Sequence, residues 1–295
     1  MRVLLSLLVS ALALAFAGMA SAQEIDWKKV DAVLGKTGAV QGSVHRYGLP
    51  RSDLRVTVDG VAIKPALALG GWVAFEPAHG GAMLMGDVVL TETEIESVMT
   101  KLLEGGVEIT ALHNHLLRAN PPTYYMHVGG HGDPVKMAGA IRAALALSKT
   151  AFEAAQGAPP PAPSVDLPTA QLDEIMAAKG QANGGVYQFG IPRRDPITEG
   201  GMAVPGAMGS ANAINFQPTG GGKAAITGDF VVTGEEVNPL IRTLRENGIE
   251  VTAIHSHMLT EQPRVFFVHF WANDDAVKLA KGLRAALEKT AITKG

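Results

Sequence analysis

The chain has 295 residues, of which 47% are hydrophobic and 5% aromatic, with a formal net charge of −3 and no cysteine. The lack of cysteine excludes disulfides, thiolate metal ligands and thiol nucleophiles, so stability must come from packing. The slightly negative charge predicts no nucleic-acid partner, because phosphate recognition needs a basic surface.

The first 22 residues have the features of a cleavable secretory signal. Arg2 precedes an apolar run over residues 3–17, and Ala20-Ser21-Ala22 supplies small residues for cleavage. The apolar run is short for a membrane span. We therefore expect a protein that begins at Gln23, lacks a membrane span after cleavage and is periplasmic or secreted. An uncleaved N-terminal anchor is the alternative.

The rest of the chain is one unit written twice. Residues 106–117 read GVEITALHNHLL, and residues 248–259 read GIEVTAIHSHML, at an offset of 142. The same offset aligns 47–51 with 189–193 and 142–145 with 284–287. Such self-similarity indicates a tandem repeat. The predicted organisation is a signal peptide at 1–22, repeat 1 at 23–156, a Pro-rich linker at 157–168 and repeat 2 at 169–295.

In chain order, each copy predicts strands, then a helix, a β-hairpin and a final helix. The first helices follow capping boxes that begin at Thr91 and Thr233, and the last helices begin at Asp133 and near Asp275. We expect strands punctuated by Gly and Pro within 54–63, 72–90 and 212–232, and strands at 107–115, near 123–129, at 249–257 and near 265–271. The predicted fold class is α+β: a tandem duplication of a strand-rich unit ending in helix–β-hairpin–helix, with two pseudo-two-fold-related domains.

A histidine cluster recurs in both copies. Strand alternation predicts that one face carries Val107, Ile109, Ala111, His113 and His115, with the histidines at its rim. In a hairpin whose paired residues sum to 238–240, His127 lies opposite or diagonal to His113 on the same face. The second copy repeats the pattern with His255, His257 and His269.

Three converging imidazoles suit a first-row divalent metal, most of all zinc, with water completing the coordination shell. Two alternatives remain open for these histidines: hydrogen-bonded structural residues, and metal-free acid–base catalysis. The sequence also leaves open whether the halves share one composite site or keep two.

Further polar residues have weaker claims to a role at the site. His131 and Glu261 each occur in one copy only, so each is a weak candidate for a ligand or catalytic base, against the alternative of an exposed polar residue. Asp87 and Asp229 follow glycines and can orient a ligand histidine through its second nitrogen. The alternative for both aspartates is a turn that caps the backbone.

Arg51 and Arg193 follow Gly-x-Pro turns, with Asp53 and Asp195 two residues further on. They are weak candidates for binding an anionic substrate. A local Arg–Asp pair within the turn is the alternative.

The paired blocks resemble the LppY/LpqO-like bacterial family, a domain of unknown function. The residues that carry the resemblance are Ala111 to Leu116 and Tyr125 to Val128, with their partners around His255 and His269. The resemblance implies an envelope or secreted location and no established activity. The named members are lipoproteins, and this chain departs from them because it has no cysteine to carry a lipid.

These observations predict an exported tandem-repeat protein that binds a divalent metal, with metal-dependent hydrolysis as its possible chemistry. The alternative is a non-catalytic envelope protein, either a metal buffer or a cell-wall-binding module. The small-molecule or envelope ligand is not identified by the sequence.

Overall fold

The computed structural model describes residues 25–152 and 164–293, and the two halves fold alike within those ranges. The predicted signal at 1–22 and most of the predicted linker lie outside the described residues. Each half has helices against one six-stranded antiparallel sheet. None of the described helices is long and apolar enough to cross a membrane.

The sheet of the first half has the strand order β1-β2-β5-β6-β8-β7, so β7 is an edge strand. The elements of this half are α1 (Trp27–Leu34), β1 (Ala39–Gln41), β2 (Val44–Pro50), β3 (Thr57–Val58), β4 (Val61–Ala62), α2 (Pro65–Ala68), β5 (Gly70–Ala78), β6 (Gly81–Leu90), η1 (Glu92–Glu94), α3 (Ile95–Glu104), β7 (Glu108–His113), β8 (Tyr124–Gly132) and α4 (Pro134–Leu145).

The sheet of the second half has the equivalent order β9-β10-β13-β14-β16-β15, with β15 at its edge. The elements of this half are α5 (Thr169–Met176), β9 (Gln181–Asn183), β10 (Val186–Pro192), β11 (Thr198–Glu199), β12 (Met202–Ala203), η2 (Gly206–Met208), β13 (Ala211–Gly220), β14 (Lys223–Thr233), α6 (Gly234–Glu246), β15 (Glu250–His255), β16 (Val265–Asp275) and α7 (Ala276–Leu287).

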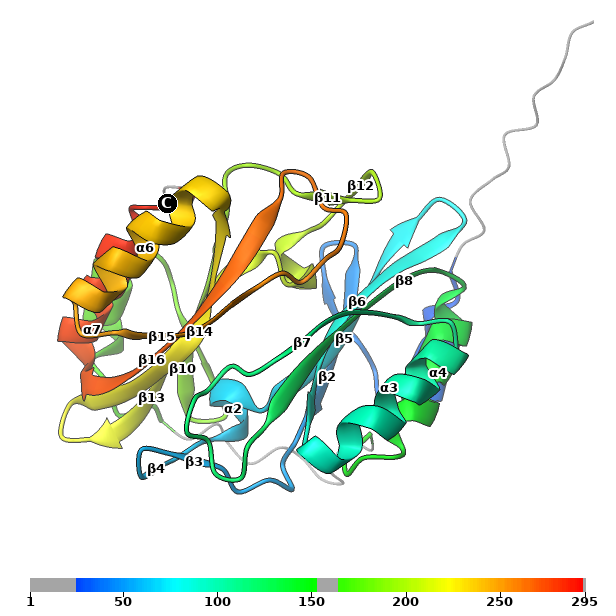
Figure 1. The fold of residues 1–295 in the computed structure, drawn as a ribbon, viewed down its shortest axis with the longest axis horizontal. Coiled ribbons are helices and arrows are strands. Elements are labelled where there is room, and N and C mark those ends of the chain that lie inside the picture. Colours follow the sequence, from blue (N-terminus) through cyan, green and yellow to red (C-terminus); the bar gives the residue numbers. More distant parts are fainter. Residues whose placement is uncertain (1–24, 153–163, 294–295) are drawn as a thin grey trace, which may run out of the picture.

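The halves lie side by side, with their long helices on the outside and the two sheets facing each other (Figure 1). α1, α3 and α4 pack on the first sheet, and α5, α6 and α7 pack on the second. Apolar side chains from both halves mix between the sheets, where Met83 and Met85 join Val231 and Phe267 in one buried cluster. The predicted α+β duplication is confirmed, and the halves share an interior.

The predicted helix starts are confirmed. Thr91 and Thr233 both form complete capping boxes. The threonine hydroxyl accepts the backbone N–H of the glutamate three residues on, and the side chain of that glutamate accepts the backbone N–H of the threonine. The carboxylate of Asp133 accepts the N–H groups of Val135 and Lys136 ahead of α4. Asp275 caps α7 in the same way. These local signals need only a few neighbouring residues, which is why the sequence reveals them.

Other predicted elements need correction. The expected strand over 54–63 is reduced to β3 and β4, two residues each. The expected interrupted strands within 72–90 and 212–232 agree with the structure, in which glycine-containing turns divide them into the hairpins β5–β6 and β13–β14. α1 and α5, which the sequence analysis did not predict, pack on the outer faces of the sheets through Val30 and Leu172.

A bulge in β7 corrects the predicted alternation. Ala111 pairs with His127, as the predicted sum of 238 requires, but the register shifts between Ile109 and Ala111. Val107 and Ile109 therefore face the helices, whereas Ala111 and His113 face the opposite sheet. The expectation that Val107 and Ile109 share a face with the histidines is wrong. β15 has the equivalent bulge between Val251 and Ala253.

Candidate metal centre

The histidines of the two halves meet between the sheets, beside the edge strands β7 and β15. The ring centroids of His113 and His255 are 3.5 Å apart, and those of His115 and His269 are 3.8 Å apart. His127 and His257 are 3.9 Å apart. Each of these close pairs joins one half to the other. The structure thus brings together all six predicted ligands in one cluster: His113, His115, His127, His255, His257 and His269.

Equivalent pairs in the two halves have nearly equal separations. The centroids of His113 and His127 are 5.1 Å apart, and those of His255 and His269 are 4.8 Å apart. His115 stacks on Tyr125 at 3.4 Å, and His257 stacks on the equivalent phenylalanine at 3.3 Å. The repeats therefore build one shared cluster from matching parts.

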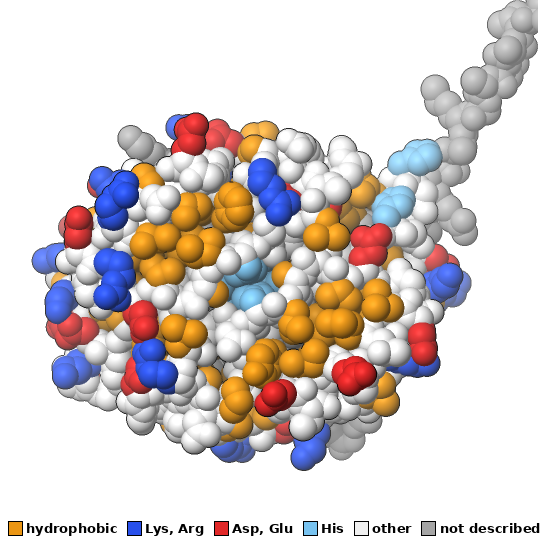
Figure 2. Space-filling model, viewed as in Figure 1, with side chains coloured by type: hydrophobic (Ala, Val, Ile, Leu, Met, Phe, Trp, Pro, Cys, Tyr) orange, Lys and Arg blue, Asp and Glu red, His pale blue; other side chains and the backbone are white. Residues whose placement is uncertain are grey.

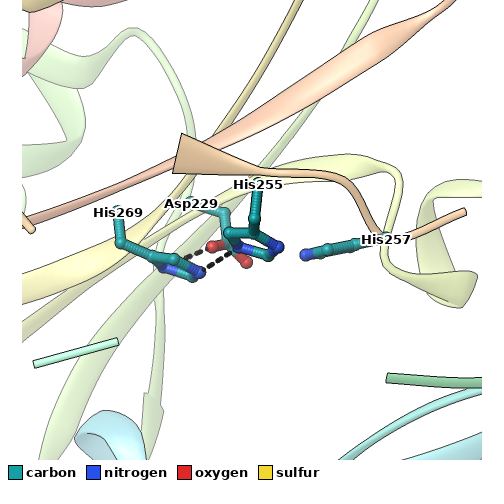
Figure 3. Close-up of side chains that lie close together, drawn as sticks. All are labelled: Asp229, His255, His257 and His269. Carbon is teal, nitrogen blue, oxygen red and sulfur yellow. Dashed lines mark hydrogen bonds and ion pairs between the residues drawn. The ribbon is translucent and has the colours of Figure 1, made fainter. Parts of the chain in front are cut away.

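The nitrogen and carboxylate atoms of the cluster form overlapping groups that can hold a metal ion. The largest group contains Asp229 and three histidines of the second half, all directed toward one another (Figure 3). Two other groups mix ligands from both halves, and a fourth contains only first-half residues. Together the four groups are Asp229–His255–His257–His269, His113–His115–His269, His113–His127–His255 and Asp87–His115–His127.

Two imidazole nitrogens in the cluster face each other with their lone pairs. The Nδ1 atom of His269 lies 2.9 Å from the carbonyl oxygen of Gly228, and Nδ1 of His255 lies 3.2 Å from that of Ser256. A carbonyl oxygen only accepts, so both Nδ1 atoms donate and both neutral rings have a lone pair on Nε2. These two Nε2 atoms are 2.7 Å apart. At that distance a proton shared between the two nitrogens relieves the repulsion of their lone pairs, whereas nitrogens that both bind zinc lie about 3.4 Å apart.

Other buried nitrogens in the cluster have no protein partner. The Nε2 atoms of His115, His127 and His257 are buried and form no hydrogen bond with described residues. A buried polar atom without a partner is costly, so in a native site such nitrogens bind an ion or ordered water. The Nε2 atoms of His113 and His269 are 3.3 Å apart, and tetrahedral zinc–imidazole geometry separates nitrogen ligands by about 3.4 Å. The donor set fits a divalent metal.

The environment keeps most of these rings neutral, as metal ligation requires. Burial and the nearby His269 lower the pKa of His255 to about 4. Burial also holds the pKa values of His115, His127 and His257 well below the ordinary histidine value. Burial opposes protonation of His269 as well, but the carboxylate of Asp229 outweighs it and raises that pKa.

The two predicted orienting aspartates both lie in the cluster. An Oδ1 atom of Asp229 is 2.6 Å from Nδ1 of His269. Asp87 is less closely engaged, with Oδ2 at 3.6 Å from Nε2 of His115 and 4.0 Å from that of His127. Burial and the neighbouring Asp229 raise the pKa of Asp87 to about 8. Burial also acts to raise the pKa of Asp229, but the neighbouring His269 outweighs it, and the pKa of Asp229 is lowered. Both aspartates also offer a direct metal ligand.

The cluster reaches the surface on one side. Figure 2 shows histidine side chains at the centre of the face that carries β7 and β15, with hydrophobic side chains on both sides of them. His113, His115 and His255 are partly exposed, and His127, His257 and His269 are buried. The strands beside the opening expose Leu112 and Ile254, at 43% and 48%. The centre is therefore accessible from this face.

The two candidate anion-binding arginines lie elsewhere. Arg51 is 1% exposed and donates to both carboxylate oxygens of Asp53 and of Glu94, the capping-box glutamate. Arg193 donates to Glu236 in the same way and lies 3.6 Å from Asp195. These contacts are the predicted local pair, extended by a helix-capping glutamate. They leave the guanidinium groups engaged with protein carboxylates.

The two weak catalytic candidates also lie outside the groups of possible ligands among the described residues. The buried carboxylate of Glu261 accepts from Nη1 of Arg264 at 3.1 Å and from the N–H of Val265 at 3.2 Å, which closes the turn before β16. His131 is exposed near the end of β8, beside a cavity of about 200 Å³ that also contacts His257.

Comparisons with known proteins agree with the duplication. The family described as Domain of Unknown Function (DUF1259) matches residues 28–147 and again residues 170–289. No curated protein matches the chain. The solved structures similar to it include a trimeric bacterial microcompartment shell protein, PduB, at 12% identity, covering 88% of this chain and 97% of that one, with a TM-score of 0.22.

A double-ringed trimeric shell protein from the RMM microcompartment is similar at 14% identity, covering 72% of this chain and 84% of that one, with a TM-score of 0.20. At TM-scores this low, neither likeness supports a conclusion about the fold or the function of this chain.

Proposed function

Because both halves of the chain belong to this family of unknown function, its role must be argued from the site, and we propose that it binds a divalent metal, zinc above all, in one composite centre. The observation that carries the proposal is the convergence of histidine nitrogens and aspartate carboxylates in groups whose ligand atoms all lie within 4.8 Å of one another. The buried Nε2 atoms of three of these histidines, which form no hydrogen bond with described residues, support it.

The proposal includes an approximate two-fold relation between the halves, which the matching centroid separations support. Possible ligand groups share His113 and His269, so they cannot all be filled independently. A substitution in either half should then disturb the metal held by the whole centre.

The test is the zinc content of the purified protein after dialysis, for the wild type, His113→Ala, His255→Ala and the double variant. We expect each single variant to lose more than half of the bound zinc, because both residues contribute to groups that span the halves. His79→Ala is the matched control, since His79 is exposed in the turn between β5 and β6. Unchanged zinc in the double variant refutes the metal centre, and a shared proton then explains the close nitrogens.

A hydrolase is the second candidate function, favoured by the cavity of about 1090 Å³ that reaches the cluster. A bound divalent metal polarises a substrate oxygen and activates water, and the Asp87 carboxyl lines the cavity beside it. Zinc-dependent turnover of ester or amide probes, lost in His255→Ala, tests this candidate. A metal buffer or cell-wall-binding module would bind zinc or envelope material without turnover.

Export, and the closer likeness to the LppY/LpqO-like proteins, belong to the proposal and rest on the sequence of residues 1–22 and of the histidine blocks. N-terminal sequencing of protein recovered from the periplasm or medium checks the location. A chain that still begins at Met1 would contradict cleavage.

A further inference from the structure

A large cavity leads from the histidine cluster to the far side of the sheet interface. It has a volume of about 1090 Å³ and is lined at one end by His115, His257 and His269, together with Asp87 and Asp229. It continues between the inner faces of β2 and β5 on one side and β10 and β13 on the other. A ligand in this cavity can therefore reach the proposed metal from within the protein.

The two walls of the cavity differ, although the halves are duplicates. Across the first sheet, Trp72 pairs with Asp87, which pairs with His127. The equivalent row of the second sheet is Ala213, Asp229 and His269. The first wall thus carries a large aromatic ring where the second has a methyl group. That difference in size leaves space on the side of the second half.

The first wall also carries a half-buried positive charge, whereas the lysine that lines the cavity from the second half, Lys179, is 89% exposed and pairs with Asp173. The guanidinium of Arg46 lies 3.7 Å from the centroid of the Trp72 ring and donates one hydrogen bond to the carbonyl of Ala207. The equivalent position in β10 is Gln188, whose amide donates to the carbonyl of Ala66. Both residues line the cavity.

Arg46 has no carboxylate partner within the described part of the chain, unlike Arg51 and Arg193. Burial lowers its pKa to about 10, against the opposing attraction of Asp87. Arg46 is half-buried in the cavity wall, and its partly desolvated guanidinium is available to pair with an anion that enters the cavity. Its planar array of donors matches the oxygens of a carboxylate or phosphate.

We propose that this cavity binds a small oxyanion-bearing molecule, whose carboxylate or phosphate group pairs with Arg46 while another part faces the histidine cluster. The inference rests on the proposed metal centre for the second contact, because the Asp229 carboxylate repels an anion unless a cation neutralises it. The anion contact itself depends only on Arg46 and the stacked Trp72. Zinc should therefore strengthen binding, and Arg46 should be needed with or without zinc.

The experiment is isothermal titration of inorganic phosphate, and separately of succinate, into zinc-loaded and zinc-free protein. The test variant is Arg46→Gln, which installs the residue found at the equivalent position of the second half. Loss of one charge-assisted hydrogen-bonding partner should weaken binding by about tenfold or more. Arg118→Gln is the control, because Arg118 is an exposed arginine outside the cavity. Arg46→Lys keeps the charge and should recover part of the affinity.

The two titrations also identify the oxyanion: tighter phosphate binding indicates a phosphorylated ligand, and tighter succinate binding a carboxylate. If the wild type binds neither anion, or if Arg46→Gln binds as tightly as the wild type, the inference is overturned. Zinc content is measured on the same samples. If the protein holds zinc but binds neither anion, the metal centre is supported and the oxyanion site is refuted. If the protein holds no zinc, the metal centre is refuted, and the titration of zinc-free protein alone tests the oxyanion site.

Discussion

Replacing Arg51 with methionine should destabilise the protein far more than removing a surface arginine. The Arg51 side chain is 1% exposed and donates five hydrogen bonds, two each to Asp53 and Glu94 and one to the carbonyl of Val89. It thereby joins the end of β2 to β6 and to the start of the α3 region. Methionine fills much of the same volume but leaves the carboxylate of Glu94 and the Val89 carbonyl without their partner.

Removing one partner of a buried ion pair typically costs about 3–5 kcal/mol. The carboxylates of Glu94 and Asp53 retain 12% and 25% exposure, so water can partly replace the guanidinium. We therefore expect a loss near the lower end, about 3 kcal/mol, in the free energy of unfolding from urea titration. Arg118→Met is the comparison, because Arg118 is 48% exposed in its pair with Asp59 and should cost less than about 1 kcal/mol.

Equal losses in the two variants would refute this reasoning and would mean that the buried pair contributes no more than a surface one. The same variants address the anion-binding alternative for Arg51. Because its guanidinium is already engaged, Arg51→Met should leave the affinity for phosphate unchanged in the titration described above.

Two further predictions concern stability. Burial would raise the pKa values of Glu94 and Glu236, but hydrogen bonds from their arginines lower them instead. Their contribution to the free energy of unfolding is therefore present above the ordinary glutamate pKa and is lost as pH falls through the lower folded value. Replacing both with glutamine should flatten the decline of the melting temperature below about pH 4.5, and an unaltered decline would count against this reasoning. Thr252→Val should lower the free energy of unfolding by about 1 kcal/mol, because the Thr252 hydroxyl donates to the His115 carbonyl in the other half. Thr110→Val should lower it less, since the equivalent hydroxyl has no hydrogen-bond partner among described residues. Equal midpoints of urea unfolding for the two variants would contradict this.

The sequence predicted what depends on near neighbours or on internal repetition. Helix starts at Thr91 and Thr233 follow from capping chemistry within four residues. The hairpin register that sets His127 beside His113 follows from the turn and the recurring spacing. The histidines stood out because duplication displays the same triple twice.

What the sequence did not predict depends on long-range packing. Alternation along β7 cannot show the bulge after Ile109, which turns the histidines toward the second sheet. The composite centre follows from how two sheets pack, and no local pattern encodes that contact. The sequence comparison did not identify Arg46, because comparing the repeats selects the residues that they share. Arg46 aligns with a glutamine, Gln188, in the second copy. A search for charged residues present in one copy alone would have found it.

The unequal cavity walls have a consequence for how the protein arose and how it can change. Two identical subunits meeting about an axis must present the same wall twice, so neither an arginine nor a tryptophan could stand on one side only. Joining both copies in a single polypeptide removes that constraint, and it also makes assembly of the centre independent of protein concentration. Duplication within one chain thus allows the two halves to differ at the cavity, with Arg46 and Trp72 on one side and Gln188 and Ala213 on the other.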